Sequence, residues 1–350
     1  MNAFEGDGAR GFAFPSGRNL DLLCLGRAGV DLYAEQAGVP LEQVQSFRKS
    51  VGGSPANIAT ALARLGGRAG VISAVSDDGL GRYVRSFLKS NGVDVQGIKT
   101  AHAGARNSLA LTEMRPDECQ VIIYRNGAAD LGLEPADMPE TLIASSRALL
   151  VTGTALSASP SREATLRAMD LARQAGTAVV LDLDYRPYGW AHAAEAATQL
   201  GRACALADMV IGNREEFDVL EHLTPQAQRD DQHSARQVLR GATRAAVVKD
   251  GGRGCRAFLR DGTALSQGVF HVQARKPFGA GDAFAATLLW QLLQGQGWAD
   301  AMRWGAAAAA LNVSRSACAE AMATLEELQA FMAEHTQTDS QPSSPGTNPL

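Results

Sequence analysis

Short apolar runs alternate along this chain with segments of helical periodicity, and this alternation restricts the fold more than any other feature. The runs lie at residues 22–25, 70–75, 148–153, 178–182, 209–212 and 245–249. Each is apolar almost throughout, as is typical of strands buried on both faces of a parallel sheet. Helical segments between them, such as 54–65 and 79–91, would provide the crossovers that parallel strands require. The sequence therefore predicts an α/β fold in which helices flank a doubly wound, mostly parallel sheet.

Two segments, 30–51 and 108–126, depart from this pattern because polar and apolar residues alternate in them. We interpret them as a small β-sheet outside the main sheet, serving as a lid over a substrate; a surface hairpin without a role is the alternative. Residues 1–19 are expected to be a flexible N-terminus and 20–335 a single domain. Residues 336–350 are rich in Ser, Pro, Thr and Asn, which predicts a disordered tail.

Composition and charge restrict the partners of the chain. Hydrophobic residues make up 45% and charged residues 20% of the 350, which is typical of a globular protein. The net charge of −4 provides no basic field for nucleic acid. No apolar stretch is long enough for a membrane span, and the first 20 residues lack the apolar core of a signal peptide. Together with five scattered cysteines, this predicts a cytoplasmic protein that acts on small molecules.

A glycine-rich turn, Gly279-Ala280-Gly281-Asp282, directly precedes the apolar segment 283–290. A turn of this kind at a helix start presents free N–H groups and the positive end of the helix dipole, and phosphate is their commonest ligand. Because an anion site needs no carboxylate, we interpret Asp282 as the base that accepts a proton when a hydroxyl attacks a phosphoryl group. In such a reaction the proton leaves late, so this role does not require a raised pKa. The alternative is an ordinary loop in which Asp282 caps the helix.

The chain has neither a P-loop nor the motifs of protein kinases, so a nucleotide would be held in another way. The best candidate is the turn from Lys249 to Gly254, which follows an apolar run. Gly251 and Gly254 would let backbone amides approach the nucleotide, and Lys249 or Arg253 would add positive charge. A plain hairpin turn is the alternative.

Asn213 and Glu216 follow another apolar run and have the spacing of a capping box, which by itself predicts only a helix start. The functional interpretation places both near a triphosphate, with Glu216 holding Mg²⁺ through water, since magnesium keeps several of its waters in proteins. The two interpretations are compatible.

Polar residues suited to a sugar occur in three further places. Asp31 and Asn57 could together hold sugar hydroxyls, although either alone is more typical of a cap or turn. Asn57 follows Gly52-Gly53 in a helix that is expected to have Ser54 as its N-cap and Pro55 as its first residue. Arg186 suits a carboxylate or phosphate, and its alternative is a local ion pair with Asp182 or Asp184.

Taken together, this set resembles the ribokinase-like (PfkB) carbohydrate kinases over about residues 20–333. The resemblance implies ATP and Mg²⁺ as cofactors, Asp282 as catalytic base and the backbone of residues 279–281 as an anion hole. It also implies the following: a sugar site with Asp31, Gly52, Gly53 and Asn57; a magnesium and phosphate motif with Asn213 and Glu216; nucleotide-loop glycines at 251 and 254; and Asn312 beside the adenine.

Two positions differ from many members of the family. Lys276-Pro277-Phe278 precedes the 279–282 turn where many have Asp-Thr, and Lys249 stands where many have Thr. With the segments 124–131, 182–190 and 314–322, these resemble the branch that phosphorylates 5-dehydro-2-deoxy-D-gluconate in myo-inositol breakdown. For such a sugar acid, Arg125 on the lid would meet the carboxylate, with Tyr124 beside it as a further substrate-binding residue. Arg186 would lie near the transferred phosphate.

Several alternatives to that substrate remain open. Within the enzyme class, 2-keto-3-deoxygluconate or fructose could replace it, with the same base and a different lid. A sugar or nucleotide sensor on the same fold is the alternative outside the enzymes, although a sensor has no need of Asp282 as a base. The resemblance also implies a homodimer, because lids of this type often pair.

Overall fold

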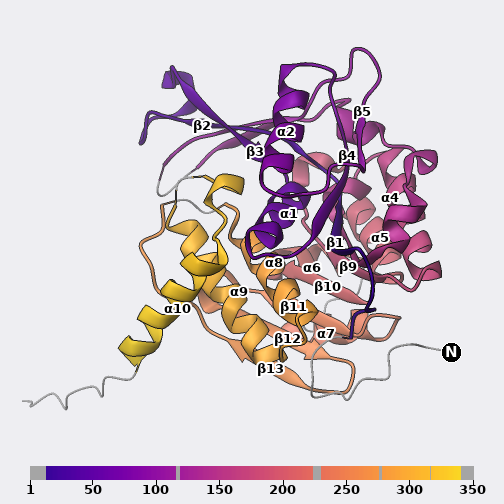
Figure 1. Cartoon of the computed structure of the whole chain (residues 1–350), viewed down its shortest axis with the longest axis vertical. Helices are drawn as coiled ribbons and strands as arrows, with labels where there is room; N and C mark the ends of the chain where they lie inside the picture. Colours follow the sequence, from indigo (N-terminus) through magenta and orange to yellow (C-terminus); the bar gives the residue numbers. More distant parts are fainter. Residues whose placement is uncertain (1–12, 116–118, 224–229, 276–277, 316, 340–350) are drawn as a thin grey trace, which may run out of the picture.

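The computed structural model describes residues 13–339 apart from 116–118, 224–229, 276–277 and 316. Its centre is a nine-stranded sheet, sheet A, with the strand order β13-β12-β11-β10-β9-β8-β1-β4-β5 (Figure 1). The seven strands from β11 to β5 are parallel, and β12 and β13 extend the sheet antiparallel. The strands are β1 (Leu20–Leu25), β4 (Ala69–Val75), β5 (Ile98–Thr100), β8 (Ser146–Thr152), β9 (Ala178–Asp182), β10 (Met209–Asn213), β11 (Ala245–Lys249), β12 (Cys255–Leu259) and β13 (Ala264–Gln267). The predicted doubly wound α/β fold is confirmed.

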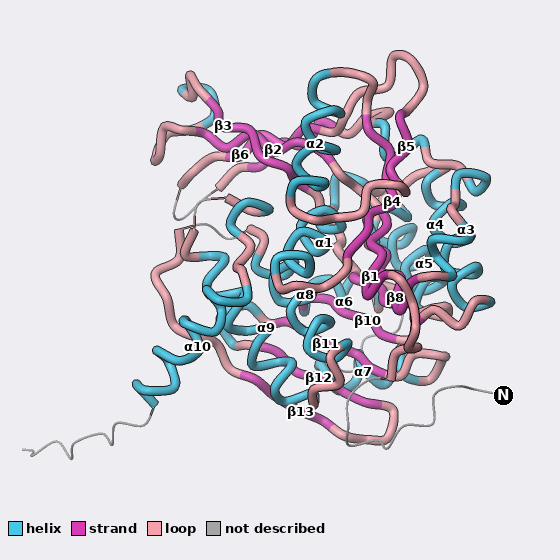
Figure 2. Tube along the Cα trace, viewed as in Figure 1, coloured by secondary structure: helices cyan, strands magenta, loops and turns pink. Residues whose placement is uncertain are grey.

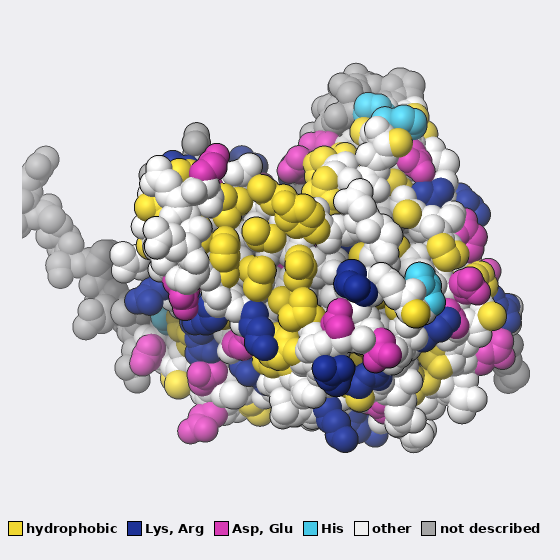
Figure 3. Space-filling model, turned by 90° about the horizontal axis from the view of Figure 1, so that it is seen from above, with side chains coloured by type: hydrophobic (Ala, Val, Ile, Leu, Met, Phe, Trp, Pro, Cys, Tyr) yellow, Lys and Arg dark blue, Asp and Glu magenta, His cyan; other side chains and the backbone are white. Residues whose placement is uncertain are grey.

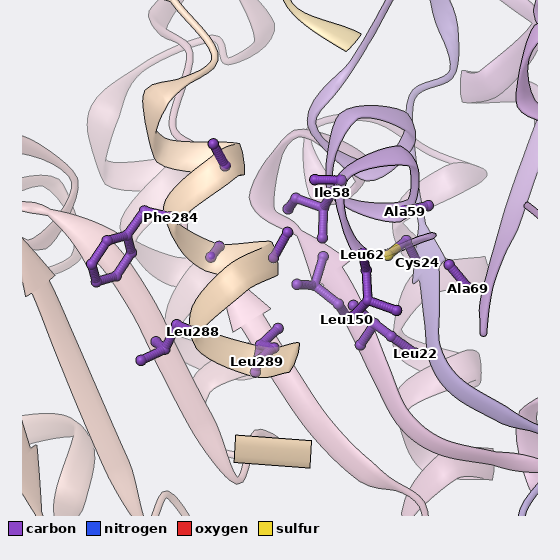
Figure 4. Close-up of a cluster of buried hydrophobic side chains, with 14 of the residues drawn as sticks. Leu22, Cys24, Ile58, Ala59, Leu62, Ala69, Leu150, Phe284, Leu288 and Leu289 are labelled. Carbon is purple, nitrogen blue, oxygen red and sulfur yellow. The ribbon is translucent and has the colours of Figure 1, made fainter. Parts of the chain in front are cut away.

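Helices cover both faces of sheet A (Figures 1 and 2). Because successive side chains of a strand point to opposite faces, Leu22 and Cys24 pack into one hydrophobic core and Leu23 and Leu25 into another. Figure 4 shows the first core, between β1, α1 and α8. The helices are α1 (Ser54–Arg64), α2 (Gly79–Ser90), α3 (Glu140–Ala144), α4 (Ser161–Gln174), α5 (Ala193–Cys204), α6 (Arg214–Leu220), α7 (Asp231–Leu239), α8 (Ala280–Leu293), α9 (Trp298–Val313) and α10 (Leu325–Asp339).

A second sheet, sheet B, lies apart from sheet A (Figures 1 and 2). Its order is β3-β2-β6-β7, with β2 (Gly29–Ala34), β3 (Phe47–Gly52), β6 (Leu109–Thr112) and β7 (Val121–Tyr124). These strands match the two segments predicted to form a small separate sheet, except that Gly29 and Gly52 lie one residue outside the first. The chain enters sheet B from the carboxyl end of β1 and leaves it into the first turn of α1. Sheet B is therefore joined to the edge of sheet A at which α/β proteins bind ligands.

Two element boundaries differ from the prediction. Helix α1 has Gly53 as its N-cap rather than Ser54, and Gly53 has φ 106°, a conformation that glycine adopts readily. A side chain at position 53 would also overlap the backbone oxygen of Arg27. At the other end of the chain, α10 continues to Asp339, so residues 336–339 are helical rather than disordered. The rest of the predicted tail, and residues 1–12 of the predicted flexible N-terminus, lie outside the described residues. No described helix is both long and apolar enough to span a bilayer.

Candidate active site

A cavity of about 870 Å³ lies where the carboxyl ends of β9, β10 and β11 meet sheet B and the first turns of α1 and α8. Segments from nearly the whole length of the chain line it, from Arg27 to Cys318. A volume of this order is at the upper end of the range for small-molecule sites, and it would accommodate two reactants side by side. The carboxyl ends of parallel strands are also where ligands bind in doubly wound sheets.

The residues of the predicted anion site lie at the start of α8. Gly279, with φ 82°, is the N-cap, and no side chain caps the helix. The first helical residues, Ala280, Gly281 and Asp282, all line the cavity. A Cβ atom added at Gly281 would lie 3.3 Å from Nζ of Lys249, so the ammonium group lies against this turn. Uncapped N–H groups, a helix dipole and a cation therefore meet at one place, which suits a phosphoryl group.

Asp282 lies in the first turn of α8 and accepts a hydrogen bond of 2.7 Å from Nδ2 of Asn57 on α1. Burial, together with the negative charges of Asp184 and Asp182, raises the pKa of Asp282 to about 6, although the hydrogen bond from Asn57 opposes the shift. The sequence interpretation did not require a raised pKa for this role, and the shift depends on the carboxylates of Asp182 and Asp184, which are remote in sequence. A carboxylate with this pKa is ionised at neutral pH and can accept a proton.

The polar residues that follow β9 form a charged cluster in the cavity wall. Asp182 lies 3.3 Å from Nζ of Lys249, and Asp184 forms an ion pair of 2.9 Å with Arg186. The local ion pair that was the alternative interpretation of Arg186 is therefore present, although Arg186 also lines the cavity. Burial alone would lower the pKa of Lys249, but Asp182, Glu216 and Asp282 raise it, so its ammonium group stays charged.

Asn213 and Glu216 form the capping box that their spacing predicted. Oδ1 of Asn213 accepts from the backbone N–H of Glu216, and Oε2 of Glu216 accepts from that of Asn213, each at 2.8 Å. Both residues also line the cavity, so capping and a role in the site are compatible. Burial raises the pKa of Glu216 to about 7, and Lys249 opposes this rise. A bound cation would relieve the cost of burying this carboxylate.

The sugar side of the cavity contains one residue that the sequence prediction missed. Asp31 on β2 lines the cavity, and Oδ1 of Asp31 accepts a 2.9 Å bond from Nη2 of Arg27. Arg27 follows β1 and is 9% exposed. Gly53 also lines the cavity, whereas Gly52 lies behind Asp31 and leaves room for its carboxylate. The position of Arg27 directly after a buried strand was the signal that could have revealed it.

Besides Gly52, two predicted site residues, Tyr124 and Asn312, do not line the cavity, and these predictions are corrected. Tyr124 is 57% exposed, whereas Val121 and Ile123 of the same strand line the cavity, because alternate residues face opposite sides. Asn312 is buried and does not line the cavity, although its neighbours on α9, Ala309, Ala310 and Val313, do. At about 100° per residue, the side chain of Asn312 falls on another face of the helix.

Arg125 lines the cavity, but its charge is already balanced. Nε and Nη2 donate to Oδ2 of Asp130 at 2.9 and 2.6 Å, and Nη1 donates to the backbone oxygen of Thr154 at 2.9 Å. All three nitrogens of this buried guanidinium therefore have protein partners. This arrangement differs from the free positive charge on the lid that the sequence suggested.

The turn after β11 is the hairpin that was its alternative interpretation, since β11 and β12 pair antiparallel. Gly251 and Gly254 nevertheless line the cavity, and both have positive φ, of 52° and 92°. The cavity also has apolar lining residues, among them Phe270, Val272 and Ala309, which we call the apolar wall. These apolar residues were not predicted as site residues because nothing in their local sequence distinguishes them from core residues.

Comparisons with known proteins agree with this fold. The model of the pfkB family carbohydrate kinases matches residues 19–325. The 5-dehydro-2-deoxygluconokinase of Photobacterium profundum is 48% identical over 320 residues, which cover 91% of this chain and 97% of that protein. The 5-dehydro-2-deoxygluconokinase 1 of Bacillus cereus is 42% identical over the same length, 91% of this chain and 96% of its own.

Solved structures show the same architecture. A fructokinase from Xylella fastidiosa with bound ATP has a TM-score of 0.81 at 27% identity, over 90% of this chain and 99% of that one. A putative ribokinase II from E. coli in complex with ATP and Mg²⁺ has a TM-score of 0.82 at 22% identity, over 90% and 100%, which supports the fold. A ribokinase-like fold with an anion site beside a buried carboxylate defines a sugar kinase. The chain belongs to the pfkB family of carbohydrate kinases.

Proposed function

We propose that this protein transfers the γ-phosphoryl group of ATP to the terminal hydroxyl of 5-dehydro-2-deoxy-D-gluconate, giving the 6-phosphate and ADP. The observation that carries the reaction is the carboxylate of Asp282 in the first turn of α8, beside uncapped N–H groups and Lys249. The substrate is supported by the 42–48% identity to relatives named for this sugar acid. We also propose a role in myo-inositol breakdown, which rests on the resemblance of the sequence to that branch of the family.

In the proposed mechanism, the hydroxyl oxygen attacks the γ-phosphorus and a new O–P bond forms. The bond between the γ-phosphorus and the oxygen that bridges to the β-phosphorus breaks, so the electron pair leaves with ADP. Asp282 accepts the hydroxyl proton, and its pKa of about 6 leaves it ionised and ready at neutral pH. The N–H groups of residues 279–281 and Lys249 stabilise the negative charge on the transferred group. Arg186, at the same end of the cavity, would contact that group as well.

ATP would lie along the carboxyl ends of β10 and β11, with its base against the apolar wall and its phosphates over Gly251 and Gly254. The residues present fit Mg²⁺, because Glu216 is a buried carboxylate whose raised pKa a cation would lower. Among the described residues, no three His, Cys, Asp or Glu side chains are grouped to hold a metal. Glu216 with Asn213 would hold the ion through water, and the ion would neutralise charge on the phosphates of ATP.

The sugar would lie between Asp31, Asn57 and sheet B, with sheet B as its lid. Asp31 can accept hydrogen bonds from hydroxyls, and Oδ1 of Asn57, which has no partner among the described residues, can accept one more. A lid of this kind would exclude water, which competes with the hydroxyl for the phosphoryl group.

The experiment that tests this proposal is ADP release by the purified protein with Mg²⁺ and ATP. We would compare 5-dehydro-2-deoxygluconate with 2-keto-3-deoxygluconate, fructose and ribose. We expect a large preference for the first sugar. Preferential turnover of another sugar would refute the substrate and retain the kinase, whereas nucleotide binding without sugar-dependent ADP release would favour a sensor.

We also propose that the protein is a cytoplasmic homodimer that pairs through the outer face of sheet B. Seen from the side on which sheet B lies, hydrophobic side chains gather in a hollow of the surface (Figure 3). Tyr124, which faces away from the cavity, contributes an exposed aromatic ring to sheet B. Exposed hydrophobic patches of this kind are typical of interaction surfaces.

A further inference from the structure

We infer that Arg27 binds the carboxylate of the sugar acid and thereby determines the preference of the enzyme for an acidic substrate. This inference rests on the proposed function, because it assumes that the hydroxyl to be phosphorylated faces Asp282. It assigns to Arg27 the contact that the sequence suggested for Arg125.

Arg27 is a buried guanidinium in the cavity wall with a nitrogen that has no partner among the described residues. Nε donates to Oγ of Ser108 at 2.7 Å and Nη2 to Oδ1 of Asp31 at 2.9 Å. No described residue accepts a hydrogen bond from Nη1. Arg27 is only 9% exposed, and it lines the cavity. A buried guanidinium with unused N–H groups facing a ligand cavity is suited to a carboxylate. Arg125 has no such nitrogen, because all three are bonded to Asp130 and Thr154.

The start of α1 adds to this positive site. Its N-cap, Gly53, has no side chain, and no acidic residue lies in its first turn. The first N–H groups of a helix have no partner within the helix, so they attract an anion. Gly53 and Ser54 line the cavity, and Gly53 is packed against the backbone and Cγ of Arg27. The guanidinium and the helix start therefore adjoin each other on one wall.

The distance along this wall matches the length of the substrate. Asn57, which donates to Asp282, lies about one helical turn from Gly53, and a turn rises roughly 5 Å. An extended six-carbon chain spans about 6 Å between its end carbons. A sugar acid whose terminal hydroxyl faces Asp282 can therefore place its carboxylate at Gly53 and Arg27. Arg186 is unsuitable for this contact, because its partners Asp184 and Glu216 lie at the phosphate end of the cavity.

The test compares the natural acid with its carboxamide, which has the same shape and no charge. The measured quantity is the ratio of kcat/KM for the acid to that for the carboxamide, and the active fraction of each preparation cancels in this ratio. In the Arg27→Gln variant we expect the ratio to fall about 10- to 100-fold, mainly through a higher KM for the acid, as for loss of a hydrogen-bonded charge. The matched control is Arg186→Gln, which should slow both substrates and leave the ratio unchanged.

The outcomes separate this inference from the proposed function. If the wild type prefers the acid and Arg27→Gln retains the full preference, the inference is wrong and the substrate stands. If the ratio falls in Arg186→Gln instead, the carboxylate lies at the phosphate end and the inference is also wrong. If the wild type does not prefer the acid, the proposed substrate fails first. Should Arg27→Gln not fold, the double variant Arg27→Gln/Asp31→Asn leaves no buried carboxylate unpaired and allows the same measurement.

Discussion

Asp282 depends for its chemistry on residues that are far away in the sequence. Asn57, 225 positions earlier, orients its carboxylate, and Asp184 and Asp182 help burial to raise its pKa to about 6. The Asp282–Asn57 hydrogen bond also joins the first turns of α1 and α8, which pack against each other in the core. At the residue scale, the base is therefore placed by the helix packing that stabilises the fold.

The Asp282→Asn variant should remove the base with little change in shape. We expect kcat to fall by about 10²–10⁴, the usual contribution of a general base. The raised pKa of Asp282 in the folded state means that ionising this carboxylate costs the wild type stability, and the full cost applies above about pH 6. The variant avoids this cost, so at pH 8 it should unfold at the same or a higher temperature than the wild type. This gain should shrink toward pH 5. Measurements of ADP release and thermal unfolding test both points, and a variant with nearly full activity would contradict the role of Asp282.

The pH dependence of the reaction follows from the same carboxylate. A base must be unprotonated, so kcat/KM should decrease as the pH falls through about 6, the raised pKa of Asp282. An unshifted aspartate would instead keep the rate constant down to a pH of about 4. A pH profile of kcat/KM for the sugar at saturating ATP distinguishes the two. If kcat/KM falls only near pH 4, bound ligands return the pKa of Asp282 to its ordinary range.

At the scale of elements, the pairing of β2 with β3 fixes the sugar side of the site. In this register Gly29 lies opposite Gly52, and Asp31 opposite Ser50. A Cβ atom at position 52 would overlap the carboxylate of Asp31. The glycine pair is therefore needed for two different reasons: Gly52 makes room for a side chain, and Gly53 adopts a positive φ at the start of α1.

The Gly52→Ala variant should accordingly displace Asp31. We expect KM for the sugar to rise about 10- to 100-fold, since a shift of about 1 Å in a binding group can cost this much. The affinity for ATP should not change, because the nucleotide side of the cavity is formed by other elements. Gly201→Ala is the matched control, since a methyl group there meets nothing within 4 Å and the site lies in helix α5. Equal KM values for the wild type and Gly52→Ala would refute the argument.

For the whole molecule, sheet B has two faces with different environments. Val121 and Ile123 face the cavity, and Tyr124 is exposed on β7 and lines no part of it. If two copies pair through this outer face, each lid would be held by its partner, so dimer formation and sugar binding would be coupled.

We therefore expect sedimentation to give the mass of a dimer for the wild type and of a monomer for Tyr124→Asp. A charge in the centre of an apolar interface is not compensated there, which disfavours association. Leu223→Asp is the control, because Leu223 is 61% exposed and follows α6, outside sheet B. A wild-type protein that sediments as a monomer would exclude this dimer.

The local sequence was sufficient to predict the fold and the places where chemistry occurs. Apolar runs with no exposed residue became the strands of sheet A, since a strand with two buried faces must be apolar throughout. Gly279 to Asp282, Asn213 with Glu216, and Gly251 with Gly254 are determined by backbone conformation and capping over a few residues. Such short-range requirements are visible in the order of the residues.

What only the tertiary structure decided was which of these residues face one another and with what charge. Tyr124 and Asn312 lie on faces that point away from the cavity, and a shift of one residue in a strand or helix is enough to cause this. Both Arg125 and Arg27 form an ion pair, with Asp130 and Asp31, but only Nη1 of Arg27 has no partner among the described residues. The raised pKa of Asp282 likewise depends on burial and on carboxylates of another strand. These properties arise from distances between parts of the chain that are remote in sequence, and such distances exist only once the chain has folded.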